Sequence, residues 1–267
     1  MDPLYLLLSL NLALVAGSMV LLWLVSLPLR DVSIVDIAWG ANGALVALAS
    51  FLLTRGPLAD GALPRGLLIT GMTVIWGLRL TVHIGRRNMG KGEDYRYAAM
   101  RREHGSAFPL RSLFTVFLFQ ALLLWAITIP VQVAQPSSVP PGLTFLDLAG
   151  TALWLVGLGF EIVADRQLSR FRADPEASGE VMDQGLWKYS RHPNYFGESL
   201  VWWGIFLVAA ATPGGWMTFF SPLLMTFFLL RVSGVPMLEA SLAERKEGYR
   251  DYMRRTSPFI PWPPNRD

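Results

Sequence analysis

The chain contains no cysteine and few charged side chains. The absence of cysteine excludes disulfide bonds, thiolate metal sites and a cysteine nucleophile. Charged residues make up 16% of the 267 residues, whereas an ordinary soluble domain carries about 25%. The three histidines, His83, His104 and His192, are far apart in the sequence. Because no two of them have the spacing of metal ligands, we expect no metal site.

Hydrophobic residues dominate the composition instead, at 52% of the chain, and the mean hydropathy is +0.39. A sequence pI near 9.4 is compatible with a nucleic-acid partner, but in an apolar chain it is more typical of basic cytoplasmic loops. We therefore expect the lipid bilayer, and no nucleic acid, as a partner.

A membrane-spanning helix needs about 20 mostly apolar residues. Seven stretches are candidates, the last two of marginal length: 3–29, 32–54, 66–84, 112–133, 145–164, 195–211 and 216–230. The sequence thus predicts an all-α, polytopic membrane protein with seven transmembrane helices, in a single domain over residues 1–267. Residues 231–267 form the predicted tail.

The distribution of basic residues predicts the orientation of these helices. Twenty lysines and arginines lie in the first, third and fifth connections and in the tail, and two lie in the second, fourth and sixth connections. By the positive-inside rule, the N-terminus lies outside and the tail in the cytoplasm.

Several polar residues lie within the predicted spans or directly beside them, all on the side that this orientation places near the cytoplasm: Asp36, Arg79, His83, Glu161, Asp165, Asn194 and Glu198. An ionisable residue inside a membrane is a candidate for a functional site. These residues come from several helices, so that we expect a polar, cytoplasm-facing active site. The alternative is that they pair with one another only to hold the helices together.

The segment Gly185–Glu198, with the sequence GLWKYSRHPNYFGE, carries the most specific pattern. Pro193 predicts the start of a helix, where free backbone amides favour an anionic ligand. Lys188, Arg191 and His192 precede it as cationic donors. A structural alternative is a juxtamembrane turn anchored by its aromatic residues.

This segment resembles the signature of the steroid 5-alpha-reductase family, and the tail GYRDY and TSPFIPW resemble the C-terminal pattern of that family. The stretches SIVDIAWG and GEDYRY look like a bacterial branch. The resemblance implies a seven-helix bundle that binds NADPH and reduces a carbon–carbon double bond conjugated to a ketone. The expected substrate is a steroid or a related lipid enone. The sequence does not predict the oligomeric state.

The resemblance also implies which residues bind the cofactor. Asn194 and Glu198 match the pair that contacts the nicotinamide carboxamide, and Asp165, Tyr189, Arg172 and Arg231 match family positions on the cofactor. Charge and placement add Arg170, Arg191 and His192, and the motifs add Tyr195 and Glu239.

The family uses a glutamate on helix two and a tyrosine on helix three as its acid pair. Here Asp36 is the acidic residue of the second span, and the third span has no tyrosine. The predicted catalytic residues are therefore Asp36 and, from the following loop, Tyr95. A competing interpretation of Asp36 is a helix-start residue after Ser33.

Two other functions remain open. Membrane methyltransferases that use S-adenosylmethionine share the Arg-His-Pro-x-Tyr-x-Gly stretch and a C-terminal glutamate with following tyrosines. The arginines near residue 170 favour NADPH, because S-adenosylmethionine has no phosphate. A non-enzymatic carrier or lipid-binding protein is the second alternative.

Overall fold

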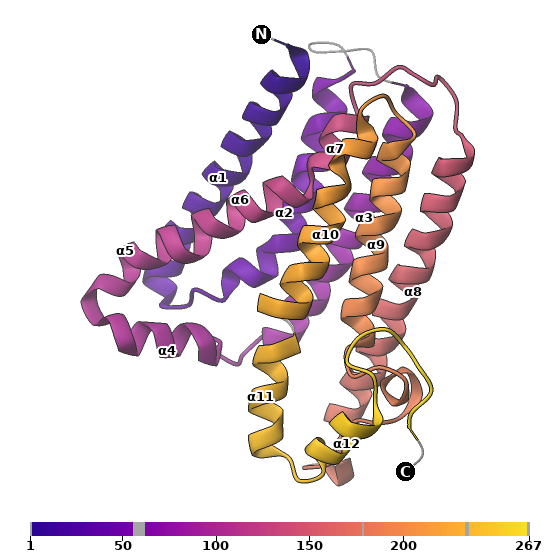
Figure 1. Cartoon of the computed structure of the whole chain (residues 1–267). Coiled ribbons are helices and arrows are strands. Elements are labelled where there is room, and N and C mark those ends of the chain that lie inside the picture. Colours follow the sequence, from indigo (N-terminus) through magenta and orange to yellow (C-terminus); the bar gives the residue numbers. More distant parts are fainter. Residues whose placement is uncertain (1, 56–61, 178, 233–234, 266–267) are drawn as a thin grey trace. The chain divides into compact units, whose positions relative to one another are not determined.

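The structure, a computed structural model, describes residues 2–55, 62–177, 179–232 and 235–265. All regular elements in these ranges are helices, which confirms the all-α prediction (Figure 1). The chain folds into two compact units, of residues 1–148 and 205–221 and of residues 149–204 and 222–267. The single domain over residues 1–267 stays a prediction.

The helices of the first unit are α1 (Pro3–Leu29), α2 (Ile34–Leu53), α3 (Leu63–Asn88), α4 (Tyr95–His104), α5 (Phe108–Ser112), α6 (Phe119–Ile127) and α7 (Ile129–Ala134). A π-helical segment, Leu113–Leu118, joins α5 to α6. The second unit contains most of α8 (Phe145–Ala173), α9 (Pro193–Ala210) and α10 (Phe220–Phe227), followed by the π-helical segment Phe228–Val232, α11 (Val235–Arg245) and α12 (Tyr249–Arg255).

In the first unit, α2 and α3 run side by side (Figure 1). Gly40 and Gly77 make this approach possible, since a Cβ atom on either would collide with the backbone carbonyl of the other. Small residues of this kind let apolar helices approach closely in a membrane. Asn11 of α1 donates to the Ser50 hydroxyl at 2.8 Å and to the Gln132 amide oxygen at 3.1 Å, which ties α1, α2 and α7 together.

A buried ion pair joins the start of α3 to the start of α8 within the same unit. The Arg65 guanidinium binds the Asp147 carboxylate at 2.9 Å, and both side chains are at most 1% exposed. Arg65 also donates to the carbonyl oxygens of Pro140 and Gly142. The predicted third span begins at residue 66 and leaves Arg65 in a loop, but Arg65 lies in the first turn of α3, and its pair with Asp147 holds the connection to α8 in place.

Glycines also set the packing of the second unit, where α8 and α9 lie side by side (Figure 1). A Cβ atom on Gly157 would be 2.6 Å from the Gly197 carbonyl oxygen, and one on Gly204 would be 2.6 Å from that of Gly150. The two backbones therefore approach too closely for any larger residue.

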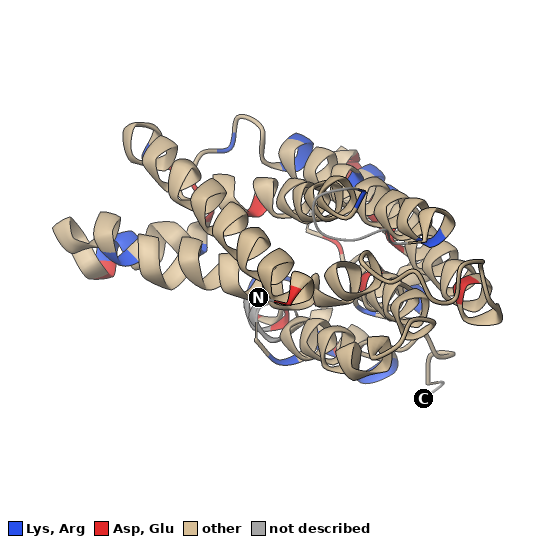
Figure 2. Ribbon diagram, turned by 90° about the horizontal axis from the view of Figure 1, so that it is seen from above, with Lys and Arg blue, Asp and Glu red and all other residues tan. Residues whose placement is uncertain are grey.

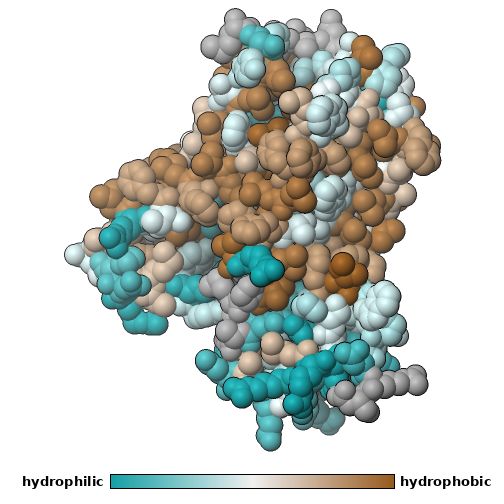
Figure 3. All heavy atoms as spheres, viewed as in Figure 1, coloured by the Kyte–Doolittle hydropathy of each residue, from teal (hydrophilic) through white to brown (hydrophobic). Residues whose placement is uncertain are grey.

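Six helical stretches of the described chain are long and apolar enough to cross a membrane: Pro3–Leu29, Ile34–Leu53, Leu63–Asn88, Tyr95–Ile127, Phe145–Ala173 and Gly215–Val232. They make the chain a multi-pass membrane protein. Helix α9 forms as predicted but is not among the six, because Asn194, Tyr195 and Glu198 make its first turns polar. Seven spans are thus not confirmed. Most of the helical ribbon carries no charge (Figure 2). Hydrophilic residues gather near α4 in the first unit and near α11 and α12 in the second (Figure 3).

Candidate functional site

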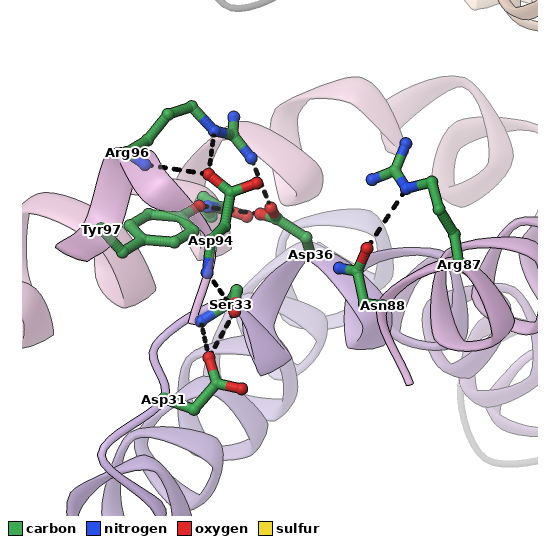
Figure 4. Close-up of polar contacts among 9 residues, drawn as sticks. Asp31, Ser33, Asp36, Arg87, Asn88, Asp94, Arg96 and Tyr97 are labelled. Atoms are coloured by element: carbon green, nitrogen blue, oxygen red, sulfur yellow. Dashed lines mark hydrogen bonds and ion pairs between the residues drawn. The ribbon is translucent and has the colours of Figure 1, made fainter. Parts of the chain in front are cut away.

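In the first unit, Asp36 lies in the first turn of α2, where both of its carboxylate oxygens accept hydrogen bonds. The Tyr97 hydroxyl donates to Oδ1 and the Arg96 guanidinium donates to Oδ2, each at 2.8 Å (Figure 4). The side chains of Asp36 and Arg96 are 18% and 29% exposed. The helix-start interpretation is incomplete, since the Asp36 side chain joins α2 to α4.

The N-terminus of α4 places Arg96 and Tyr97 at this carboxylate. Asp94 caps the helix by accepting from the Arg96 backbone amide, and it also accepts from Arg96 Nε at 2.8 Å. The Asp94 amide in turn donates to the Ser33 hydroxyl beside α2. Burial would raise the pKa of Asp94, but the hydrogen bonds from Arg96 outweigh it and hold the pKa below its ordinary value.

The two tyrosines at the start of α4 differ in their exposure to solvent. Tyr95, the predicted catalytic tyrosine, is 53% exposed. Tyr97 is 7% exposed, and its hydroxyl both donates to Asp36 and accepts from the Gln120 amide at 3.3 Å. The structure therefore brings Tyr97 to Asp36, whereas Tyr95 was the one chosen from the sequence among the two tyrosines of this loop.

In the second unit, Asn194 and Asp165 meet where α9 begins against α8. The Asn194 amide nitrogen donates to Asp165 Oδ1 at 3.3 Å. The Asn194 amide oxygen is buried and has no hydrogen-bond partner among the described residues. Glu198, one helical turn further along α9, is half-buried.

The remaining predicted cofactor residues of this unit include several exposed side chains. Arg170 and Arg172 extend from the last turn of α8, and Arg231 from the π-helical segment after α10. Tyr189 is 42% exposed. These four side chains are thus exposed at the surface of the described structure.

Arg191 and His192 are instead engaged inside the protein, together with the predicted cofactor residue Glu239. Arg191 Nε and Nη2 donate to the two Glu239 oxygens at 2.7 and 3.2 Å, and His192 Nε2 lies 3.0 Å from Glu239 Oε1. Burial would raise the pKa of Glu239, but hydrogen bonds from His192 and Arg191 outweigh it and lower the pKa.

The tail binds along the segment that precedes α9. The Ser190 hydroxyl donates to the Phe259 carbonyl at 2.7 Å, and the Trp262 amide donates to the Tyr189 carbonyl at 2.9 Å. The Tyr252 hydroxyl donates to the Trp187 carbonyl. The described part of the predicted tail thus contains α11 and α12, followed by residues 256–262, which lie against the segment Gly185–Glu198 and which we call the strap.

Comparison with known proteins gives the family. The family described as "Protein of unknown function (DUF1295)" matches residues 22–256. The chain belongs to this family. An uncharacterized protein of Schizosaccharomyces pombe is 25% identical to this DUF1295 chain, over 90% of the chain and 75% of the yeast protein.

The DUF1295 chain is also similar to 3-oxo-5-alpha-steroid 4-dehydrogenase 1 of Bos taurus, with 36% identity over 69 residues, and of Homo sapiens, with 32% identity over 74 residues. These matches cover 26% and 28% of the chain and 26% and 29% of the two enzymes. The chain thus spans less than a third of their length. No solved structure matches. The resemblance to the steroid 5-alpha-reductase family is confirmed.

Proposed function

We propose that the protein is an NADPH-dependent membrane oxidoreductase that reduces the carbon–carbon double bond of an enone in a steroid or a related lipid. The observation that carries the proposal is the buried amide oxygen of Asn194, which lacks a partner among the described residues. A buried polar atom without a partner is costly, and a ligand that donates a hydrogen bond removes that penalty.

The donor set of the second unit fits this cofactor. A carboxamide needs both an acceptor and a donor, and the Asn194 amide oxygen with the Glu198 carboxylate offers acceptors beside the Asn194 amide nitrogen. Arg170, Arg172 and Arg231 are exposed cations that would bind phosphates, with Arg172 assigned to the 2′-phosphate. Asp165 holds the Asn194 amide in orientation.

Bound NADPH would supply a hydride to the β carbon of the enone. The chain must then stabilise negative charge on the carbonyl oxygen, and a hydrogen-bonded acid pair does this. We assign this role to Asp36 with Tyr97, where Tyr97 takes the place expected for Tyr95. The pair would hold one acidic proton and donate it to the carbonyl oxygen as the hydride arrives, so that an enol forms and then tautomerises to the saturated ketone. Arg96 positions the Asp36 carboxylate from the side opposite Tyr97.

We further propose that α9 is the seventh span, so that the N-terminus lies outside and the tail and active site face the cytoplasm. A reporter fused after Asp267 should be cytoplasmic, and one inserted at Ser137 should lie outside. Reporters on the same side would contradict this topology.

Nucleotide binding by the purified protein tests the function. NADPH should bind more tightly than NADH, and Arg172→Gln should reduce this preference. Arg250→Gln, at an exposed position of α12, should leave it unchanged. Equal affinity for NADPH and NADH would contradict the assignment. Tight binding of S-adenosylmethionine would instead support a methyltransferase. A protein that binds none of these three ligands would support a non-enzymatic carrier. Reduction of progesterone, followed by NADPH absorbance, is the first activity assay.

A further inference from the structure

The cluster of Arg191, His192 and Glu239, which we call the clamp, contains two of the cations that the sequence assigns to the cofactor. Arg191 meets Glu239 through two nitrogens, and the side chains are 9% and 10% exposed. Its third nitrogen, Nη1, donates to the carbonyl oxygens of Met253 and Thr256 at 2.5 and 2.8 Å. Every nitrogen of the guanidinium is thus already bonded within the protein.

The clamp joins three segments that are distant in the sequence. Glu239 belongs to α11, Met253 to α12, and the Arg191 backbone amide donates to the Ser257 carbonyl in the strap at 2.9 Å. A buried arginine with this many acceptors is typical of a structural anchor. It is not placed to bind a phosphate from solution.

His192 connects the clamp to the start of α9. Its ring lies parallel to that of Tyr195, with an interplanar angle of 3° and centroids 5.4 Å apart. The Phe196 amide donates to the His192 carbonyl at 3.0 Å, which is one of the first hydrogen bonds of α9. Whatever fixes His192 therefore also fixes the backbone that carries Asn194.

We propose that Glu239 is a positioning residue for the nicotinamide end of the cofactor site. Its carboxylate orients His192 and neutralises Arg191, and through them it sets the first turn of α9 and the direction of the Asn194 amide. Arg191, His192 and Glu239 then do not contact the phosphates, which are left to the exposed arginines. The proposal rests on the proposed binding of NADPH.

A comparison of NADPH with a fragment of it tests this role without measuring turnover. Adenosine 2′,5′-bisphosphate keeps the adenosine and the 2′-phosphate of the cofactor but lacks the nicotinamide. Calorimetric titrations in detergent would give the Kd of both ligands for the wild-type protein and for Glu239→Gln. We expect Glu239→Gln to weaken NADPH roughly tenfold or more, the size typical of a lost hydrogen bond to a charged group, and to leave the fragment unchanged within about twofold.

The matched control is Glu244→Gln, which removes the same charge from an exposed position of α11 and should change neither Kd. If Glu239→Gln does not fold, Glu239→Asp keeps the charge with a shorter reach and should give a smaller loss in the same selective direction. Equal weakening of both ligands, or no change in either, would overturn the positioning role. Failure of the wild-type protein to bind NADPH would instead refute the proposed function.

Discussion

Asp36 with its partners in the first unit and Glu239 with its partners in the second are arginine–carboxylate clusters with similar members, but they differ in how fully the chain encloses them. In the first unit, Asp36 pairs with Arg96 and Tyr97, and the side chains of the ion pair are 18% and 29% exposed. In the second unit, Glu239 pairs with Arg191 and His192, and the ion pair is 10% and 9% exposed.

The two arginines also differ in their hydrogen-bond acceptors. Arg191 binds two backbone carbonyls besides its carboxylate, whereas the side-chain bonds of Arg96 go to the carboxylates of Asp94 and Asp36. A cluster closed by backbone groups holds chain segments together. A cluster that is partly exposed and consists of side chains can contact a ligand. This contrast makes Asp36, rather than Glu239, the candidate for a catalytic residue.

The largest effect should come from Asp36→Asn. Loss of the acid pair should lower the rate of enone reduction by about 10²–10⁴-fold, the range typical of a general acid, while the Kd of NADPH stays unchanged. Steady-state rates and nucleotide titrations check both parts. Glu103→Gln, an exposed carboxylate of α4, should leave the rate at the wild-type level. Wild-type turnover by Asp36→Asn would reduce Asp36 to a structural residue that joins α2 to α4.

For stability, the order of the two clusters should be reversed, so that losing the arginine of the second unit costs more than losing that of the first. Arg191→Met leaves the buried Glu239 carboxylate with His192 alone among its clamp partners and should destabilise the protein by about 3–5 kcal/mol, as when a buried ion pair loses one member. Arg96→Met breaks a more exposed pair and should destabilise it by about 1 kcal/mol. Thermal unfolding in detergent measures both. Equal losses would mean that the two clusters do not differ in enclosure.

Among the tyrosines, Tyr97→Phe should lower enone reduction by about 10²-fold, because the phenol bonded to Asp36 is gone. Tyr95→Phe is the matched control and should have little effect, since Tyr95 is half exposed. Rates measured at saturating NADPH decide between them. The reverse result would restore Tyr95, the tyrosine predicted from sequence, as the partner of Asp36.

The choice between these tyrosines shows what the sequence could and could not predict. Apolar stretches of about 20 residues marked the long helices, because length and hydropathy are local properties. The short helix α4 is polar and was missed, although Asp94 is a typical N-cap. With the helix starting at Tyr95, residues 95 and 97 lie on different faces of α4. The N-cap therefore indicated that only one of these two tyrosines can point toward Asp36.

The clamp had no such local signal. Arg191 and Glu239 are 48 positions apart in the sequence, and counting charges identifies cations without their partners. Arg65 and Asp147, 82 positions apart, were missed for the same reason. What the sequence predicted well was where most of the long apolar helices lie, and what it could not predict was which buried charges neutralise one another.

The smallest effect concerns the pH dependence of the clamp. The pKa of Glu239 in the folded protein lies below its ordinary value of 4.5, so that its carboxylate stabilises the fold above that value and loses this contribution as the pH falls through the folded pKa. At pH 7, Glu239→Gln should destabilise the protein by about 1–3 kcal/mol. The difference in melting temperature between wild type and Glu239→Gln should stay constant from pH 7 to about pH 5 and shrink below pH 4.5. Glu244→Gln, whose side chain is exposed, should show no such difference at any of these values. A difference that already declines between pH 7 and pH 5.5 would mean that another group controls the clamp, and Glu239 would then not be the carboxylate that holds the start of α9.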